Sequence, residues 1–273
     1  MSPLTESTRL TLAKQSVAPG LLDAYGGAAA AYSLRRLSAN YTGPVVRVRR
    51  SSDSTEQDFS ATQVTDGTLT TFCGAGNGFV RTWYDQSGNG NHAEQSTMAN
   101  QPLIVQSGTL VTESGLPCLD FNGVLQRLAT SLLGNIVSTT FCVAKGRSES
   151  SYGRIFGFGQ EHSVGTFGSF STWGFYKSTA TISSLTGYPW SARTLVSLLY
   201  RERSTCVLAG NSGSGISFTH TTTTSIGGLT IGDSGEATEC GDVLIQELIY
   251  YANNQSSNQA AIVANINAHY AIY

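Results

Sequence analysis

The rhythm of short apolar runs limits the fold of this chain more than any other feature. From about residue 100 onward, runs of aliphatic, aromatic and β-branched residues alternate with glycine, serine, threonine and asparagine, roughly every 8–15 residues. This rhythm is typical of a β-sandwich. The strands that it predicts, together with two earlier ones, are Val45–Arg49, Phe79–Tyr84, Leu103–Val105, Cys118–Phe121, Thr140–Lys145, Arg154–Phe158, Gly174–Tyr176, Thr194–Arg201, Thr205–Ala209, Leu229–Ile231 and Val243–Tyr251.

Composition agrees with an all-β fold. The chain has 30 glycines in 273 residues, and only 12% of its residues are charged, against roughly 25% in an average globular protein. Glycine accepts positive φ angles and hydroxyl side chains stabilise turns, so this balance suits many short strands. We expect one sandwich domain over residues 21–273, which is large enough to bury a core without disulfides.

Two helices and an arm are expected outside the strands. Residues 21–37 contain four successive alanines and predict one short helix. Residues 256–270 predict a second, because Ser256 and Gln259 have capping-box spacing and Ile262, Ile266 and Tyr270 repeat every fourth residue. Residues 1–20 are polar and read as an amino-terminal docking arm.

Basic residues are concentrated near the amino terminus. Residues 1–50 hold seven basic and two acidic side chains, a net charge of +5, whereas the whole chain carries −2. One interpretation is a basic contact surface for an acidic partner. The alternative is that Arg47, Arg49 and Arg50 pair with the nearby acidic residues Asp53, Glu56 and Asp58. Five net charges are too few to indicate a nucleic-acid partner.

The five cysteines are scattered, and they form no zinc-binding pattern. We expect buried free thiols. Residues 1–20 lack the basic start and apolar run of a signal peptide, and no apolar run is long enough to cross a membrane. We therefore expect no cofactor, no structural metal and no membrane partner.

Two segments are candidates for specific roles. The sequence from Asp85 to His92 (DQSGNGNH) predicts a compact turn in which the side chains of Asp85, Asn89 and Asn91 bond to the backbone, and calcium binding by their oxygens is the alternative. Aromatic residues crowd residues 173–190 and form either an exposed platform for sugar rings or part of the core. The candidate carbohydrate-binding residues are Trp173, Tyr176, Tyr188 and Trp190.

Residues 28–59 and 79–93, the second of which contains the Asp85–His92 turn, resemble the catalytic domain of fungal α-L-arabinofuranosidases. They resemble still more closely a class of phage and prophage virion proteins. Residues 229–251 and the final helix are similar to the end of laminin-G-like and concanavalin A-like domains. The resemblance implies an all-β, concanavalin A-like jelly-roll sandwich over residues 21–273.

The resemblance also implies a test for catalysis. Asp233 matches the position of the catalytic acid of the arabinofuranosidases, whereas their nucleophile is a glutamate in an aromatic and glycine-rich segment. The corresponding stretch here, Phe167 to Ile182, contains no carboxylate, and Glu161 lies near it without a clear alignment. A retaining glycosidase requires two carboxyl groups. On this ground we expect no catalytic residue, and Asp233 serves as the acid only in the alternative reading.

The expected function is a non-enzymatic structural or accessory protein of a phage virion, either capsid decoration or a tail or baseplate adhesin. Its expected partners are other virion proteins and further copies of itself in a homo-oligomer, with a surface glycan on the aromatic face. The expected location is the virion, made in the host cytoplasm. The alternatives are a diverged arabinofuranosidase-like glycoside hydrolase that uses Asp233, and a free carbohydrate-binding module.

Overall fold

The computed structural model describes residues 20–147, 153–159, 162–166, 172–177, 180–201, 203–213, 215–219, 227–233 and 239–273. These residues form a sandwich of two β layers whose named strands all pair in antiparallel fashion. The all-β expectation is confirmed. The expected docking arm lies outside the described residues except for Gly20.

The first layer is centred on the long last strand, which has a neighbour on each side over its whole length. β21 pairs with β12 along one edge, and with β1 and β10 in succession along the other. The strands of this layer are β19 (Ile216–Thr219), β18 (Thr205–Gly210), β17 (Thr194–Arg201), β12 (Val137–Gly146), β21 (Asp242–Tyr251), β1 (Ala30–Ser33) and β10 (Leu119–Asn122).

The second layer faces the first and continues into a smaller group of strands beside it. The strands of the layer are β16 (Ala180–Pro189), β15 (Thr172–Lys177), β14 (Ser163–Gly165), β13 (Arg154–Phe158), β20 (Gly228–Ile231) and β11 (Leu128–Leu133). The strands that lead back to β10 are β5 (Ala93–Glu94), β4 (Gly78–Trp83), β2 (Val46–Arg50), β3 (Glu56–Phe59), β6 (Leu103–Gln106) and β7 (Thr109–Leu110). A separate hairpin is formed by β8 (Thr112–Glu113) and β9 (Leu116–Pro117).

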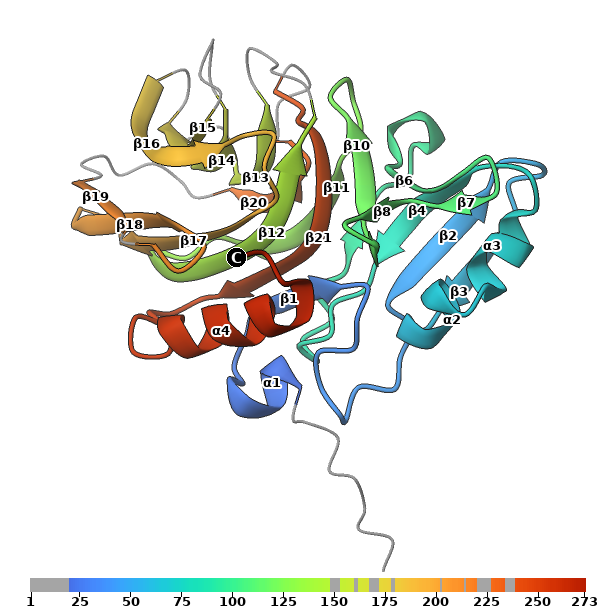
Figure 1. Cartoon of the computed structure of the whole chain (residues 1–273), viewed down its shortest axis with the longest axis horizontal. Coiled ribbons are helices and arrows are strands. Elements are labelled where there is room, and N and C mark those ends of the chain that lie inside the picture. Colours follow the sequence, from blue (N-terminus) through green and yellow to red (C-terminus); the bar gives the residue numbers. More distant parts are fainter. Residues whose placement is uncertain are drawn as a thin grey trace, which may run out of the picture.

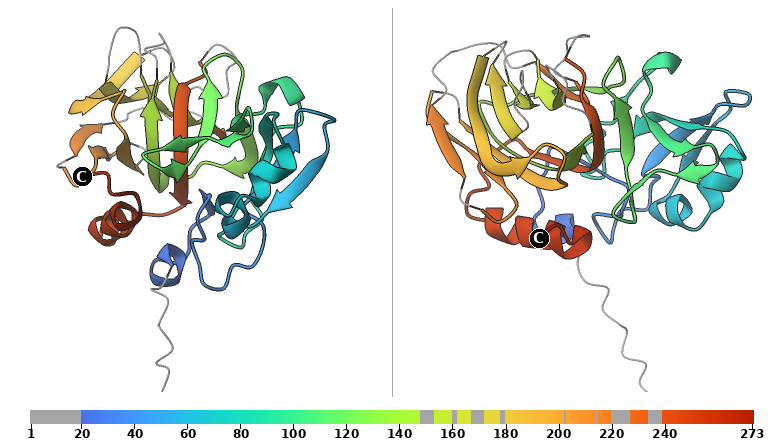
Figure 2. Two further views of the ribbon diagram at one scale, coloured as in Figure 1. Left: turned by 45° about the vertical axis from the view of Figure 1, so that its right-hand side comes forward. Right: turned by 45° about the horizontal axis from the view of Figure 1, so that its top comes forward.

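Two apolar clusters stabilise this arrangement. The larger cluster fills the space between the layers and includes Trp83, Phe121, Phe156 and Trp173. The smaller one lies on the outer face of the first layer, under α1 (Leu21–Ala24) and α4 (Gln259–Tyr270). Both helices run below that layer in Figures 1 and 2.

The carboxy-terminal helix is confirmed, and Ile262, Ile266 and Tyr270 form its buried face. Its amino-terminal cap differs from the expected capping box, because Asn258 is the capping residue and its side chain makes no cap bond. Among the described residues, no helix combines the length and the apolar character that a membrane crossing requires.

The short amino-terminal helix is present, but it does not extend over residues 21–37 as expected. Helix α1 ends at Ala24, Gly27 has a φ of +81°, and residues 30–33 form β1. All four β1 residues are buried, with backbone partners on β21. Burial beside β21 therefore outweighs the helical propensity of the alanines.

Three short helices were not expected from the sequence: α2 (Ala61–Thr65), α3 (Thr68–Cys73) and the 3-10 helix η1 (Met98–Asn100). Helix α2 begins with a capping box in which the backbone N–H of Ser60 donates to the side chain of Gln63, and the reverse bond is also formed. Helices α2 and α3 lie beside β3 at the edge of the domain (Figure 1).

The arginines of β2 form ion pairs and hydrogen bonds within the protein. Arg47 pairs with Asp58 at 2.7 Å and Arg50 pairs with Asp53 at 2.6 Å. Arg49 instead donates to Gln101 at 2.7 Å and lies over the ring of Phe79. Internal pairing thus accounts for much of the basic character of residues 1–50. All five cysteines are buried and free, as expected.

Candidate functional site

Asp233 lies directly after β20, where the chain turns at Gly232. The φ of Gly232 is +85°, and a Cβ at this position would lie 2.2 Å from the Phe121 ring, so only glycine fits. The Asp233 side chain is fully buried, and one of its oxygens lies 2.9 Å from the Arg127 guanidinium. Its backbone carbonyl accepts a hydrogen bond from Thr230 at 2.9 Å. The carboxylate is thus held by a cation directly before β11 and by the local turn.

A second arginine and a second carboxylate lie next to Asp233. Arg154, at the start of β13, is fully buried, and its Nε lies 3.5 Å from a carboxylate oxygen of Glu239. Its guanidinium lies 4.2 Å from the centre of the Tyr176 ring, and it donates to the Thr166 carbonyl at 2.6 Å. Glu239 is therefore oriented by a cation that is itself fixed on two sides.

Cys240 joins these two carboxylates. Its backbone forms a bridge with Arg154, and its thiol interacts with the Asp233 side chain. Burial raises the pKa of the Cys240 thiol to about 12, and the Asp233 carboxylate contributes to this rise. Because Glu239 precedes Cys240, the acidic groups of Asp233 and Glu239 belong to one local cluster.

A third arginine completes the charged end of the sheet. Arg147, just after β12, donates to Asp120 at 2.7 Å and pairs with Asp242 at 2.7 Å. Burial raises the pKa of Asp120, and the Arg147 guanidinium opposes this rise. We call the following residues the charged end: Asp120, Arg127, Arg147, Arg154, Asp233, Glu239 and Asp242. It combines carboxylates that can exchange protons with arginines that stabilise negative charge.

Three of the four predicted sugar-binding aromatic residues lie in the core. Trp173, Tyr176 and Trp190 are at most 1% exposed, and the rings of Trp173 and Trp190 pack with centroids 4.5 Å apart. Tyr188 is only partly buried and packs against Gly210 and Gly213. The first three rings therefore offer no exposed face to a sugar, because each is in contact with protein on both sides. These three rings are therefore part of the core, which is the second of the two interpretations given above.

The Asp85–His92 segment forms a compact turn that closes onto β1. One oxygen of Asp85 accepts the backbone N–H groups of Ala31 and Ser87, each at 2.8 Å. The other accepts from the Ser87 hydroxyl and the Asn91 N–H. The Asn91 side chain donates to the Ala29 carbonyl at 2.8 Å.

The remaining side chains of this turn are used in the same way. Asn89 donates to the Ala28 carbonyl at 2.9 Å, and the His92 Nδ1 accepts the N–H of Asp85 at 3.1 Å. These bonds occupy the groups that calcium would require. Within the described residues, no group of three or more histidine, cysteine or acidic side chains is arranged to hold a metal ion.

Sequence reasoning found only Asp233 in the charged end, and Arg127, Arg154 and Glu239 are among the members that it missed. Arg127 precedes Asp233 by 106 residues, and none of the three stands in a recognisable motif. Glu161, considered above as a nucleophile, lies outside the described residues. The stretch Phe167 to Ile182 is described only from 172 to 177 and from 180 onward.

Comparison with known proteins shows which family and which solved structures the chain is similar to. The family described as "Alpha-L-arabinofuranosidase B, catalytic" matches residues 23–112. No curated protein matches the chain. Among solved structures, a GH54 α-L-arabinofuranosidase soaked with a cyclic sulfate inhibitor superposes with a TM-score of 0.72 at 17% identity, covering 91% of this chain and 65% of that chain. The chain therefore shares the fold of this enzyme.

Two further structures agree. A GH54 α-L-arabinofuranosidase with a glutamate changed to glutamine, soaked with 4-nitrophenyl α-L-arabinofuranoside, has a TM-score of 0.71 at 17% identity, covering 91% of this chain and 65% of that one. An arabinofuranosidase complexed with arabinofuranosyl-α-1,2-xylobiose has a TM-score of 0.66 at 15% identity, with 91% and 64% covered. The chain thus spans slightly less than two thirds of these three enzymes.

These findings correct the expected function. The expectation of a non-enzymatic virion protein is wrong, because the matched family is a catalytic domain and the similar structures are glycosidases. They favour the alternative, a glycoside hydrolase. The virion location and the homo-oligomer stay predictions that these comparisons do not test.

Proposed function

We propose that this chain is a glycoside hydrolase of the arabinofuranosidase type and that Asp233 and Glu239 are its two reacting carboxyl groups. The observation that carries the proposal is the placement of Asp233. A buried carboxyl group, held by Arg127, lies just beyond the core strand β20 and interacts with the Cys240 thiol. The backbone of Cys240 forms a bridge with Arg154, whose side chain pairs with the second carboxylate, Glu239. The match to a catalytic-domain family supports the reaction class.

The chemistry requires one carboxyl group as acid and one as carboxylate. Asp233, when protonated, donates its proton to the glycosidic oxygen as the bond to the sugar breaks. Arg127 then stabilises the carboxylate that remains. The Glu239 carboxylate attacks the anomeric carbon or removes a proton from the attacking water, and it keeps its orientation through Arg154.

The choice of sugar also rests on similarity. Two of the similar structures are enzymes that were studied with 4-nitrophenyl α-L-arabinofuranoside and with arabinofuranosyl-α-1,2-xylobiose. We therefore propose a terminal α-L-arabinofuranosyl group as the substrate. The configuration of the released sugar, read by NMR, distinguishes direct attack by Glu239 from attack by water, because only the former retains the configuration.

The test is hydrolysis of 4-nitrophenyl α-L-arabinofuranoside by the full chain and by the variants D233N and E239Q. We expect the unmodified chain to release nitrophenol and each variant to lose about a hundredfold or more in rate, as for other general acids and bases. The matched control is D58N, which removes a carboxylate of similar pairing outside the charged end.

Thermal unfolding of each variant shows whether lost activity reflects lost structure. No turnover by the folded, unmodified chain overturns the proposal, and binding of the glycoside without turnover then identifies a carbohydrate-binding domain. Full activity in D233N assigns the acid to another residue.

A further inference from the structure

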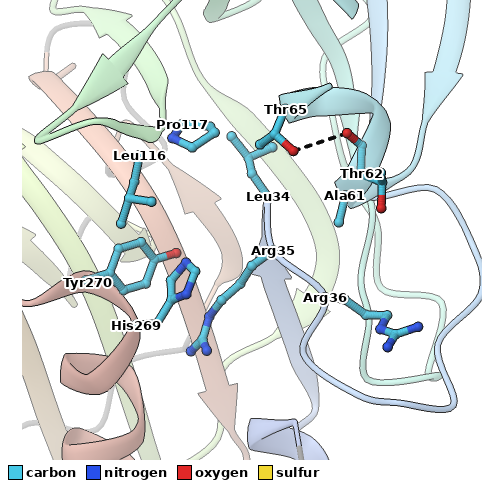
Figure 3. A pocket seen from close by; sticks show the side chains of 10 residues that line it. All are labelled: Leu34, Arg35, Arg36, Ala61, Thr62, Thr65, Leu116, Pro117, His269 and Tyr270. Atoms are coloured by element: carbon cyan, nitrogen blue, oxygen red, sulfur yellow. Dashed lines mark hydrogen bonds between the residues drawn. The ribbon is translucent and has the colours of Figure 1, made fainter. Parts of the chain in front are cut away.

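Two features beyond the side chains of the charged end bear on the chemistry of this protein. The first is a mostly apolar cavity of about 300 Å³ between α4, α2 and the end of β1 (Figure 3). Arg35 at this cavity is paired with Glu247, and Figure 3 shows Arg36 pointing away from the apolar walls. Neither arginine is therefore placed to act on a ligand there, and the second feature carries more.

The second feature is the sequence Asn–Gly, which occurs three times. The backbone nitrogen that follows an asparagine can attack the carbon of the side-chain amide and expel ammonia. A following glycine favours this reaction, because it has no side chain to obstruct the attack. The three pairs are Asn77–Gly78, Asn89–Gly90 and Asn122–Gly123. The structure holds them in different ways, so we expect them to react at different rates.

Two of the three pairs are restrained by their neighbours. Gly78 is the buried first residue of β4 and is paired with a residue of β2 and a residue of β6, so its nitrogen is fixed in the sheet. The Asn89 amide nitrogen donates to the carbonyls of Ala28 and Ala29 at 2.9 and 3.3 Å. It also donates to the Ser87 hydroxyl at 3.0 Å. Ammonia can leave Asn89 only after these three hydrogen bonds are broken.

Asn122 is restrained in neither way. It is the exposed last residue of β10, and within the described residues neither its amide nitrogen nor the N–H of Gly123 makes a hydrogen bond. The Val124 N–H donates to the Asn122 Oδ1 at 3.1 Å. The ring of atoms closed by this bond contains both the Gly123 nitrogen and the Asn122 side-chain carbon. The attacking and the attacked atom are therefore folded toward each other.

The same hydrogen bond favours the chemistry. An N–H group that donates to a carbonyl oxygen stabilises the negative charge that develops there during attack, as the donors of an oxyanion hole do. The glycine is also required by the fold, because its φ is +71° and a Cβ at Gly123 would lie 2.9 Å from the Asp242 Cβ. The fold therefore demands the residue that makes this pair reactive.

We propose that Asn122 deamidates spontaneously in the folded protein, ahead of the other two Asn–Gly pairs. The Gly123 nitrogen gives up its proton and bonds to the side-chain carbon of Asn122. The bond from that carbon to the amide nitrogen breaks, and ammonia leaves with the proton. Water then opens the five-membered succinimide to aspartate or isoaspartate, so the net reaction consumes one water and releases one ammonia.

The product adds a carboxylate beside the charged end. Asn122 is the partner of Asp242 in the register of β10 and β21, and it lies two residues after Asp120 on the same face of β10. Arg147 already pairs with both of these aspartates. Deamidation therefore places a third carboxylate where one arginine serves two, and isoaspartate also lengthens the backbone at this end of β10. The site goes beyond the proposed hydrolase activity and does not rest on it.

The test is incubation of the full chain in warm, mildly alkaline buffer, followed by peptide mapping with mass spectrometry, in which each deamidation adds one mass unit. We expect the peptide that contains Asn122 to convert about ten times faster than the peptides that contain Asn77 and Asn89. In guanidinium chloride, where the fold is lost, the three peptides should convert at similar rates. The comparison separates the effect of the structure from that of the Asn–Gly sequence.

The variant N122Q keeps the amide but would have to close a less favourable six-membered ring. The acidic species that anion-exchange chromatography separates from the ageing protein should therefore disappear. The matched control is N77Q, which removes the pair held in the sheet and should leave that species unchanged, and thermal unfolding shows that both variants are folded. Equal rates at the three sites of the folded chain, earlier conversion at Asn77 or Asn89, or an Asn122 that stays intact while the unfolded chain reacts each overturns the proposal.

Discussion

The guanidinium of Arg35 binds both carboxylate oxygens of Glu247, although 212 residues separate the two in the chain. The pair joins the segment just after β1 to β21, and Glu247 is only 1% exposed. It is therefore a largely buried ion pair that ties the chain after the first strand to the last strand.

Changing Glu247 to Gln should reduce the free energy of unfolding by about 3 kcal/mol, because the buried Arg35 charge would lose its partner. Urea unfolding measures the loss. The exposed pair of Arg47 and Asp58 is the control, since both side chains are more than a third exposed, and D58N should cost less than about 1 kcal/mol. Equal losses in the two variants would contradict the distinction between these pairs.

Asp85 is expected to matter through the hydrogen bonds that it accepts. D85A should lower the free energy of unfolding by about 3 kcal/mol, because the buried N–H of Ala31 and the N–H of Asn91 lose their acceptor. D85N, which keeps one oxygen, should be milder. The control is D66A, where an exposed aspartate accepts only the local Thr68 N–H. Calcium should not change any of these stabilities, and a calcium-dependent rise would favour the metal alternative for this turn.

Gly146 is expected to tolerate no side chain. A Cβ there would lie 1.8 Å from the indole nitrogen of Trp190, which is 1% exposed. G146A should therefore destabilise the domain by about 1–3 kcal/mol through overpacking. G26A is the matched control, because its Cβ would come no closer than 3.5 Å to the Leu22 carbonyl. Comparable melting temperatures for G146A and the unmodified protein would show that Trp190 can move aside.

The buried thiols predict a loss of stability in alkali. Burial raises the pKa of Cys73 to about 11 from its ordinary value of 9.0, and that of Cys240 to about 12. The unfolded chain releases these protons near pH 9, whereas the folded chain keeps them. Stability is therefore complete below pH 9 and falls as the pH rises toward 11.

Denaturation at a series of pH values measures this loss, and the variant C73A should show a smaller part of it. An aromatic disulfide reagent should also react slowly with the native protein and should reach all five cysteines after unfolding. Rapid reaction of the native protein would mean that a thiol is more accessible than the structure shows.

Part of the strands could be predicted from the sequence because their apolar residues and turns are local signals, whereas others, such as β11 and the long β16, were not expected. The expected segment Val243–Tyr251 differs from β21 by one residue, and Arg154–Phe158 coincides with β13. The prediction of a helix over residues 21–37 failed because a run of alanines carries no information about β21. That strand pairs with Ala30 and Ala31 and buries them, although it lies more than two hundred residues later in the chain.

The candidate site was harder to predict, because its decisive contacts join distant segments. The resemblance to the arabinofuranosidases indicated Asp233, but its partner Arg127 could be found only from the fold. The packing of Trp173 against Trp190 could likewise be found only from the fold. Spacing alone does not distinguish rings that pack against each other in a core from rings that face solvent.

β21 pairs with β12, β1 and β10, and so it is the neighbour that three other strands share. During synthesis, each of those strands must leave the ribosome with one edge unpaired until residues 242–251 have emerged. The domain therefore closes only after β21 has emerged, and until then the open edges of its earlier strands are exposed to pairing with other chains.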